Sequence, residues 1–136
     1  MSSPRPLSKK QVLDYLARGE SLAGTDLRGN DLSGVTFDGA DLTASKLAEC
    51  NLSRATFRGC KLVAASLWHS ECKDACFDDA DLEEADLDFT NLDGATFHRA
   101  KVKKTIFPFH RLSLDDVLTS VRTGVKVRME SRGAGE

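Results

Sequence analysis

Apolar residues occupy every fifth position of the chain from Leu22 to Phe107, without a gap. We call these eighteen positions the centres: Leu22, Leu27, Leu32, Phe37, Leu42, Leu47, Leu52, Phe57, Leu62, Leu67, Cys72, Phe77, Leu82, Leu87, Leu92, Phe97, Val102 and Phe107. From Val35 to Thr105, the residue two positions before each centre is Ala, Ser, Cys, Thr or Val. A period of five matches neither the α-helix, at about 3.6 residues per turn, nor the alternation of a β-strand. The pattern predicts a chain that turns one corner per repeat and points one large and one small side chain inward.

Residues twenty positions apart have related identities, which predicts how the repeats stack. Phe37, Phe57, Phe77 and Phe97 follow one another at this spacing, whereas the other centres are almost all Leu until the end of the repeat. Four repeats per coil would place these Phe side chains above one another on one wall. Eighteen repeats at four per coil correspond to about 4.5 coils. We therefore expect an all-β solenoid with four sides and an interior of Leu and Phe.

A short helix is predicted on each side of the repeat. Before the repeat, Ser8 and Gln11 match a capping box, and a helix over residues 9–18 is expected to end at Gly19. After the repeat, Ser113 is a candidate N-cap for a second helix. Because a solenoid exposes its core at both ends, we expect the two helices to act as caps.

The chain of 136 residues is long enough for one domain with a single core. Residues 125–129 alternate between apolar and polar side chains like a short strand, and residues 131–136 are expected to form a flexible tail. We divide the chain into an N-terminal arm with a capping helix (1–19), a repeat region (20–109), and a C-terminal helix, strand and tail (110–136).

The repeat resembles the pentapeptide-repeat family, whose consensus is roughly A-(D/N)-L-x-x. Clear matches are Ala40-Asp41-Leu42, Ala80-Asp81-Leu82, Ala85-Asp86-Leu87 and Thr90-Asn91-Leu92. The resemblance covers residues 20–109 and implies a right-handed quadrilateral β-helix. It also implies two kinds of behaviour seen in the family. Some members, including quinolone-resistance types, resemble duplex DNA in shape and charge and act on DNA gyrase, and members often dimerise through their C-terminal ends.

Charged residues are nearly balanced, with 19 Lys and Arg against 21 Asp and Glu and a formal net charge of −2. This balance argues against a chain held on nucleic acid or on a membrane by bulk charge. No apolar run approaches the ~18 residues of a membrane span, and the first residues, MSSPRP, do not resemble a signal peptide. We therefore expect a cytoplasmic, bacterial protein with reduced cysteines and no direct contact with nucleic acid or membrane.

Few residues in the chain are suited to catalysis. The sequence contains no phosphate-binding loop, nucleophile motif or paired catalytic carboxylates. His69, Cys72 and Cys76 have a spacing that resembles a zinc motif, but Cys72 is a centre and only Cys76 is expected near the surface. A shaft filled with Leu and Phe also leaves no room for a pocket. We expect no enzymatic activity, no metal and no cofactor.

One outward column contains aromatic residues where the repeat usually has small or polar ones. Two residues after the centre, this column reads Gly29, Glu49, His69, Phe89 and Phe109, with Trp68 and Asp88 beside it. Exposed aromatic clusters mark protein interfaces. We predict that a protein partner contacts Trp68, His69, Phe89, Phe109 and Asp88. The alternative is that the C-terminal helix folds back over Phe109 and Phe89.

The C-terminal end is a second candidate interaction surface. An alternating strand at the end of a solenoid exposes unpaired backbone groups, to which another subunit can add. The candidate residues for a homodimer are Val117, Val121, Val125, Val127 and Met129. The alternative is that the strand docks on the last coil of its own chain, and the sequence leaves both arrangements open.

Acidic residues gather in one coil, between Glu71 and Asp93. The acids that would lead a DNA mimic are Asp78, Asp79, Asp81, Glu83, Glu84, Asp86, Asp88 and Asp93. Stacking places bases beside many of them, as in the column Asp41, Lys61, Asp81, Lys101. We therefore predict a non-enzymatic protein-binding module, acting as an adaptor, a regulator or an immunity-type inhibitor. A DNA mimic that acts on DNA gyrase or another type II topoisomerase, and a structural spacer, are the alternatives.

Overall fold

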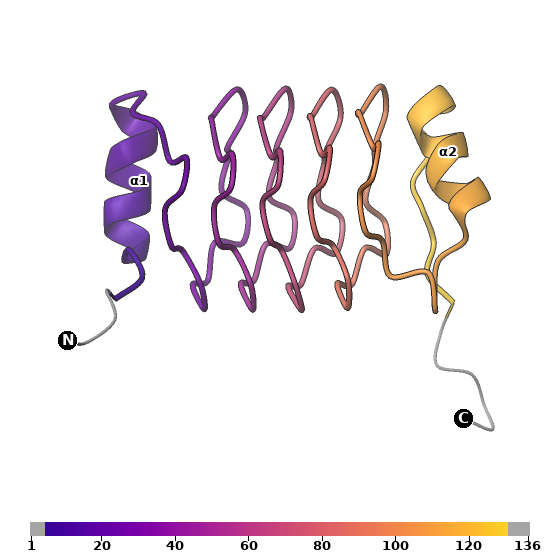
Figure 1. The fold of residues 1–136 in the computed structure, drawn as a ribbon, viewed down its shortest axis with the longest axis horizontal. Helices are drawn as coiled ribbons and strands as arrows, with labels where there is room; N and C mark the ends of the chain where they lie inside the picture. Colours follow the sequence, from indigo (N-terminus) through magenta and orange to yellow (C-terminus); the bar gives the residue numbers. More distant parts are fainter. Residues whose placement is uncertain (1–4, 131–136) are drawn as a thin grey trace.

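Backbone hydrogen bonds join successive coils along most of the chain. The computed structural model describes residues 5–130 and contains parallel bridges between residues twenty apart, from Asp26 with Lys46 to Asp86 with Ile106. Each bridge stands alone, because the chain turns again within five residues and no longer strand forms. Figure 1 shows the result, a row of similar coils between two helices. The chain forms a four-sided solenoid, as the four repeats per twenty residues predict.

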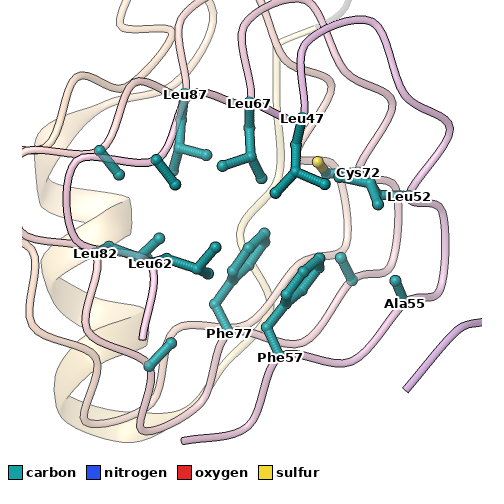
Figure 2. Close-up of a cluster of buried hydrophobic side chains, with 14 of the residues drawn as sticks. Leu47, Leu52, Ala55, Phe57, Leu62, Leu67, Cys72, Phe77, Leu82 and Leu87 are labelled. Atoms are coloured by element: carbon teal, nitrogen blue, oxygen red, sulfur yellow. The ribbon is translucent and has the colours of Figure 1, made fainter. Parts of the chain in front are cut away.

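The four Phe centres stack on one wall of the interior, which we call the Phe wall (Phe37, Phe57, Phe77 and Phe97). Neighbouring ring centroids lie 4.9, 5.0 and 5.1 Å apart, and the ring planes are within 6° of parallel. Figure 2 shows Phe57 and Phe77 side by side, opposite Leu side chains of the other walls. Burying each ring contributes about 1.5–3 kcal/mol before the loss of chain entropy. The stacking predicted from the twenty-residue spacing is confirmed.

The other centres are also buried, with one exception in the last coil. Every centre from Leu22 to Phe97 is fully buried. Val102 is only half-buried, although it packs against the same core. We call the wall that ends at this residue the Val102 wall; its centres are Leu22, Leu42, Leu62, Leu82 and Val102. The interior is therefore closed along the shaft and less covered at one wall of its C-terminal end.

The second residue after each centre adopts a left-handed backbone conformation. Gly59 has a φ of 63°, and Ala64 in the next repeat has a φ of 58°. Glycine reaches this conformation without steric cost, whereas a residue with a Cβ atom loses roughly 1–2 kcal/mol. This cost explains why Gly recurs two residues after the centre. It also means that the backbone does not favour any larger residue at this position.

Helix α1 (Lys9–Ala17) lies at the N-terminal end of the solenoid (Figure 1). The predicted capping box is present, since Ser8 Oγ accepts from the Gln11 N–H at 3.1 Å and Gln11 Oε1 accepts from the Ser8 N–H at 2.8 Å. The helix ends one residue before the predicted boundary, with Arg18 as its C-cap. Val12 is fully buried in the core. The apolar face of α1 therefore packs on the first coils.

Helix α2 (Leu114–Thr123) lies at the opposite end (Figure 1). Ser113 is its N-cap, as predicted. Val117 is fully buried, and Ser120 Oγ accepts a hydrogen bond from the Phe97 N–H at 3.0 Å. On the Phe wall, α2 thus supplies the acceptor that a further coil would supply. Neither α1 nor α2, the helices of the described residues, is long and apolar enough to cross a membrane.

The segment after α2 docks on the last coil of its own chain and does not form the predicted strand. Within residues 125–129 only Val127 pairs with the coil backbone: its N–H donates to the Ala95 carbonyl and its carbonyl accepts from the Gly94 N–H, both at 2.8 Å. A longer ladder cannot form because the coil turns away after one residue. The flexible tail predicted at 131–136 lies outside the described residues, as do the first four residues of the predicted arm.

Candidate protein-binding surface

Four ring side chains meet on the outer surface of one corner, and we call them the aromatic cluster (Trp68, His69, Phe89 and His110). The Trp68 ring centroid lies 4.9 Å from that of His69 and 6.2 Å from that of Phe89, and the Trp68 and Phe89 planes are at 74°. Trp68 is 40% exposed and Phe89 is 54% exposed. Edge-to-face ring pairs are favourable. The rings therefore hold one another in place while much of their surface stays open to solvent.

His110 is the member of the aromatic cluster that the sequence did not predict. The expected residue was Phe109, which is twenty positions after Phe89. The bridges end before Pro108, which has no N–H to donate, and the chain leaves the repeat there. As a result the His110 ring lies 5.5 Å from the Phe89 ring, whereas the Phe109 ring lies 5.8 Å from Phe107. The signal for this change was the Pro inside what would be the next repeat.

Helix α2 does not cover the rings, which was the alternative arrangement. Phe89 remains 54% exposed and Phe109 remains 50% exposed. The helix packs on the Phe wall instead, where Ser120 binds the Phe97 N–H. Among the described residues, the aromatic cluster is therefore an open surface.

Two members of the aromatic cluster occupy the left-handed position of their repeat. His69 has a φ of 61° and Phe89 has a φ of 58°. Gly29 occupies the same column near the start of the solenoid, with a φ of 75°. Bulky residues in sparsely populated backbone regions cost about 1–3 kcal/mol and gather at functional sites. Since the fold would be better served by Gly, these rings point to a role beyond folding.

A shallow groove runs along one side of the aromatic cluster. Its volume is about 170 Å³, and it is lined by His69, Ser70, Glu71, Phe89, Thr90, Asn91, His110 and Arg111. The Ser70 and Thr90 hydroxyls donate to backbone carbonyls at 2.7 and 2.6 Å, and Asn91 Nδ2 donates to Glu71 Oε1 at 2.6 Å. Ligand pockets usually have about 300–1,000 Å³. The groove is therefore sized for one side chain of a partner and not for a whole ligand.

Asp88, the polar residue predicted for this surface, is used mainly to shape the turn. Its carboxylate accepts from the Phe89 N–H at 3.0 Å, and its carbonyl accepts from the His69 N–H at 3.1 Å. The side chain is half-buried. Asp88 therefore fixes the backbone that presents the two rings.

Two of the acids considered for DNA mimicry form ion pairs with neighbouring coils. The Arg99 guanidinium donates to both carboxylate oxygens of Asp79, at 2.7 and 3.0 Å, and this hydrogen bonding lowers the pKa of the Asp79 carboxyl. Arg58 lies 3.6 Å from Asp78, whose carboxylate also accepts from the His98 N–H at 3.0 Å. The alternation of charge predicted for these outward columns is present at both positions.

The other acids of this coil are partly used within the chain. The carboxylates of Asp81 and Asp86 accept from backbone N–H groups two residues further on, at 3.1 and 2.9 Å. Asp93 lies 3.6 Å from an Arg of the C-terminal segment. Glu83 and Glu84 form no ion pair with the described residues. Duplex DNA carries about one charge per 1.7 Å of its axis, so this coil has far less uncompensated charge than a DNA mimic needs.

The residues predicted for dimerisation are only partly accessible. Val117 and Val127 are buried within the chain itself, so they are not free to contact another subunit. Val121 and Met129 are half-buried, and the Met129 sulfur accepts from a backbone N–H of the last coil at 3.0 Å. Val125 is exposed. The exposed apolar residues at this end are Leu114, Leu118 and Val125.

The cysteines lie in the interior. All four are buried, including Cys76, which was expected near the surface; it is covered because it stands between Thr56 and Thr96 of the adjacent coils. Burial raises the pKa of Cys60 to about 12 and also raises the pKa of Cys72. A metal-binding thiol needs the opposite shift. Among the described residues, no group of His, Cys, Asp and Glu is placed to hold a metal ion.

The repeat also matches a known family description. A model described as "Pentapeptide repeat region" matches residues 30–107, which is more than half of the 136 residues. A search of the curated proteins finds no match.

Solved structures with a similar fold come from cyanobacteria and a plant. A pentapeptide repeat protein from Nostoc PCC 7120 is 27% identical with a TM-score of 0.70, and the match covers 87% of this chain and 97% of that one. A pentapeptide repeat protein from the Arabidopsis thaliana thylakoid lumen is 31% identical over 59% of each chain, with a TM-score of 0.53. Rfr23 from Cyanothece 51142 is 26% identical with a TM-score of 0.55, and the match covers 61% of this chain and 64% of that one. The chain thus spans less than two thirds of the Arabidopsis and Cyanothece proteins.

Proposed function

The chain belongs to the pentapeptide-repeat family, and from that premise we propose that it is a non-enzymatic protein-binding module whose contact surface is the aromatic cluster. The observation that carries this proposal is the exposed pair Trp68 and Phe89, with ring centroids 6.2 Å apart. Trp and Tyr together with Arg dominate the energetics of protein interfaces, and exposed aromatic patches mark them. The module would act as an adaptor, a regulator or an immunity-type inhibitor.

The solenoid is well suited to present such a surface. Each ring is fixed to a coil that is hydrogen-bonded to the coils on both sides, so the aromatic cluster changes little in shape when a partner docks. The Trp68 and Phe89 planes meet at 74° and leave an open angle beside the groove. A partner side chain placed there would be desolvated on several sides, which is the usual setting of an interface hot spot.

Affinity capture from the source cells tests this proposal. The bait is the full chain, compared with Trp68→Ala and with a Leu13→Ala control. Leu13 is 41% exposed and Trp68 is 40% exposed, so the two variants remove apolar surface of similar accessibility from different places. We expect a protein that the wild type and Leu13→Ala capture and that Trp68→Ala loses. Equal capture by all three baits would contradict the proposal.

A DNA mimic acting on DNA gyrase is the alternative function. The ion pairs of Asp78 and Asp79 with bases of adjacent coils weigh against it. We expect no effect of the full chain on gyrase supercoiling at micromolar concentration. Inhibition that persists in Trp68→Ala would favour the DNA mimic over the protein-binding module.

We also propose that α1 and α2 cap a shaft of about 4.5 coils and that Leu114, Leu118 and Val125 form any homodimer contact. Burial of Val12 and Val117 at the two ends supports the capping role. Sedimentation of the wild type and of Leu118→Glu tests the homodimer. A monomer at all concentrations would exclude it without affecting the role of the aromatic cluster.

A further inference from the structure

The last coil of the Val102 wall ends in two backbone donors without an acceptor. In the coil before it, the N–H groups of Leu82 and Glu84 donate to carbonyls of the next coil at 2.8 and 3.1 Å. The equivalent donors of the last coil are Val102 and Lys104. Neither donates a hydrogen bond to any of the residues 5–130. The hydrogen-bond ladder of this wall therefore stops with its donors open.

The same coil is closed on two other walls. The Gly94 N–H donates to the Val127 carbonyl at 2.8 Å, and the Arg99 N–H donates to the Val121 carbonyl at 2.9 Å. The Phe97 N–H donates to a side chain of α2 at 3.0 Å. The C-terminal helix and segment thus cover part of the end of the solenoid (Figure 1) and leave the Val102 wall uncovered.

The docked C-terminal segment shows what would fit the uncovered wall. Val127 forms two bonds with the coil, accepting from the Gly94 N–H and donating to the Ala95 carbonyl. Two repeats further on, the Lys104 N–H and the Thr105 carbonyl occupy the equivalent positions. The Thr105 carbonyl accepts no hydrogen bond from the described residues. One residue of an extended segment can therefore form the same pair of bonds on this wall.

The side chains around these groups define the chemistry of the segment. Val102 is half-buried, so an apolar side chain above it would complete the core, as Val127 does on its own wall. Lys101, Lys103 and Lys104 are exposed and form no ion pair with the described residues. Opposite charges across an interface steer association and fix register. The uncovered wall therefore calls for acidic side chains next to the apolar one.

The charge of this chain's own C-terminal segment makes a second copy a poor occupant. On its own wall, Arg128 follows Val127 and lies 3.6 Å from Asp93. The residue equivalent to Asp93 on the Val102 wall is Lys103. A copy of the same segment would place an Arg beside a Lys, and like charges in contact are unfavourable.

We propose that the open edge formed by Val102, Lys104 and Thr105 binds an extended acidic segment of another protein by strand addition. The segment supplies a carbonyl and an N–H to the edge, an apolar side chain over Val102, and carboxylates to Lys101, Lys103 and Lys104. This site is separate from the aromatic cluster and does not depend on it.

Amide hydrogen exchange of the full chain, followed by NMR, tests the open edge directly. The probe is a blocked synthetic octapeptide of alternating Val and Glu, and the control peptide alternates Val and Lys. Without peptide, the Val102 and Lys104 amides exchange at least about 100-fold faster than those of Leu82 and Glu84, because ladder bonds protect the latter. The Val/Glu peptide slows both open amides, whereas the Val/Lys peptide leaves them unchanged.

Three results would overturn the proposal. The first is protection of Val102 and Lys104 in the isolated chain at low concentration, which would mean that the chain covers its own edge. The second is protection that appears only as the protein concentration rises, which would assign the edge to a second copy. The third is equal protection by both peptides, or binding of the Val/Glu peptide without protection of these two amides.

A charge reversal separates the chemistry of the site from its backbone geometry. Lys103→Glu with Lys104→Glu weakens binding of the Val/Glu peptide about tenfold, because favourable pairs become unfavourable ones. The matched control, Lys9→Glu with Lys10→Glu, changes the net charge equally at the opposite end and leaves the affinity unchanged. Equal loss in both variants would reduce the effect to overall charge and refute an acidic-segment site.

Discussion

The protein contains two groups of ring side chains that obey opposite rules. On the Phe wall, four identical rings are fully buried and stack within 6° of parallel, at 4.9 to 5.1 Å. In the aromatic cluster, Trp, His and Phe rings are exposed and meet at angles from 27° to 74°. The first group follows from the repeat, and the second departs from it.

This difference separates the residues that fold the chain from the residues that the fold tolerates. A buried Phe at a centre removes apolar surface from water and contacts a like ring on each side, so every gain comes from folding. Phe89 has a φ of 58° and much exposed surface, so it gives the folded chain little. Removing rings of each kind should therefore affect different measurements.

The largest effect is expected inside the Phe wall. Phe57→Ala removes a ring that lies 4.9 Å from Phe37 and 5.0 Å from Phe77, and it leaves a cavity that the hydrogen-bonded coils cannot close. We expect the free energy of unfolding to fall by about 3–5 kcal/mol, measured by urea denaturation. Phe57→Leu, which keeps most of the volume, should cost much less. Similar losses for the two variants would show that ring stacking and not volume supports this wall.

The next effect concerns partner binding and not folding. Trp68→Ala removes an exposed ring, so the free energy of unfolding should change by less than about 0.5 kcal/mol. The affinity for the captured partner should fall by about 2 kcal/mol, as for an interface hot spot. Calorimetric titration measures the affinity and urea denaturation measures the stability. A stability loss as large as that of Phe57→Ala would remove the distinction between the two groups of rings.

A smaller effect tests the backbone position of Phe89. Phe89→Gly and Phe89→Ala both remove the ring, but only Gly reaches a φ of 58° without steric cost. We expect the Gly variant to be about 1 kcal/mol more stable than the Ala variant, with partner binding weakened in both. The same pair of substitutions at Leu118 in α2 should give the opposite order, because Ala is favoured in a helix. The same order at both sites would contradict a left-handed cost at Phe89.

The smallest effect is expected on the outer side of the Phe wall, at the pair Asp79 and Arg99. The hydrogen bonds from Arg99 lower the pKa of the Asp79 carboxyl in the folded chain. A lowered pKa stabilises the folded chain above the ordinary pKa of Asp, about 3.9, and this contribution is lost as the pH falls through the folded value. Both side chains are exposed, so the loss should be slight. Arg99→Gln should flatten the pH dependence of unfolding below pH 4, and an unchanged profile would show that the pair contributes nothing.

The parts of the structure that repeat were predictable from the sequence. The stacking of the Phe wall follows from the spacing of its four members, and the ends of α1 follow from Ser8, Gln11 and Gly19. These features depend on neighbours in sequence or on a fixed spacing of twenty residues. The ion pair of Arg58 with Asp78 was predicted by the same spacing.

The parts that were missed lie where the repeat stops or where a column is crowded. His110 replaced Phe109 in the aromatic cluster because Pro108 ends the bridges, and no periodic argument places a residue beyond that point. Cys76 is buried because of its Thr neighbours in adjacent coils, which depends on side-chain volume and not on position in the repeat. The docking of Val127 depends on where α2 releases the chain, which is a tertiary effect.

The left-handed residue after each centre has a consequence for how this protein can change. Its side chain points away from the interior, so substitutions there alter the exterior without repacking the shaft, at a steric toll that is similar at every storey. Four such vertices recur in each coil. Evolution or a designer can therefore write a new recognition epitope along one vertical line of the scaffold, residue by residue, while the filling of Leu and Phe stays untouched.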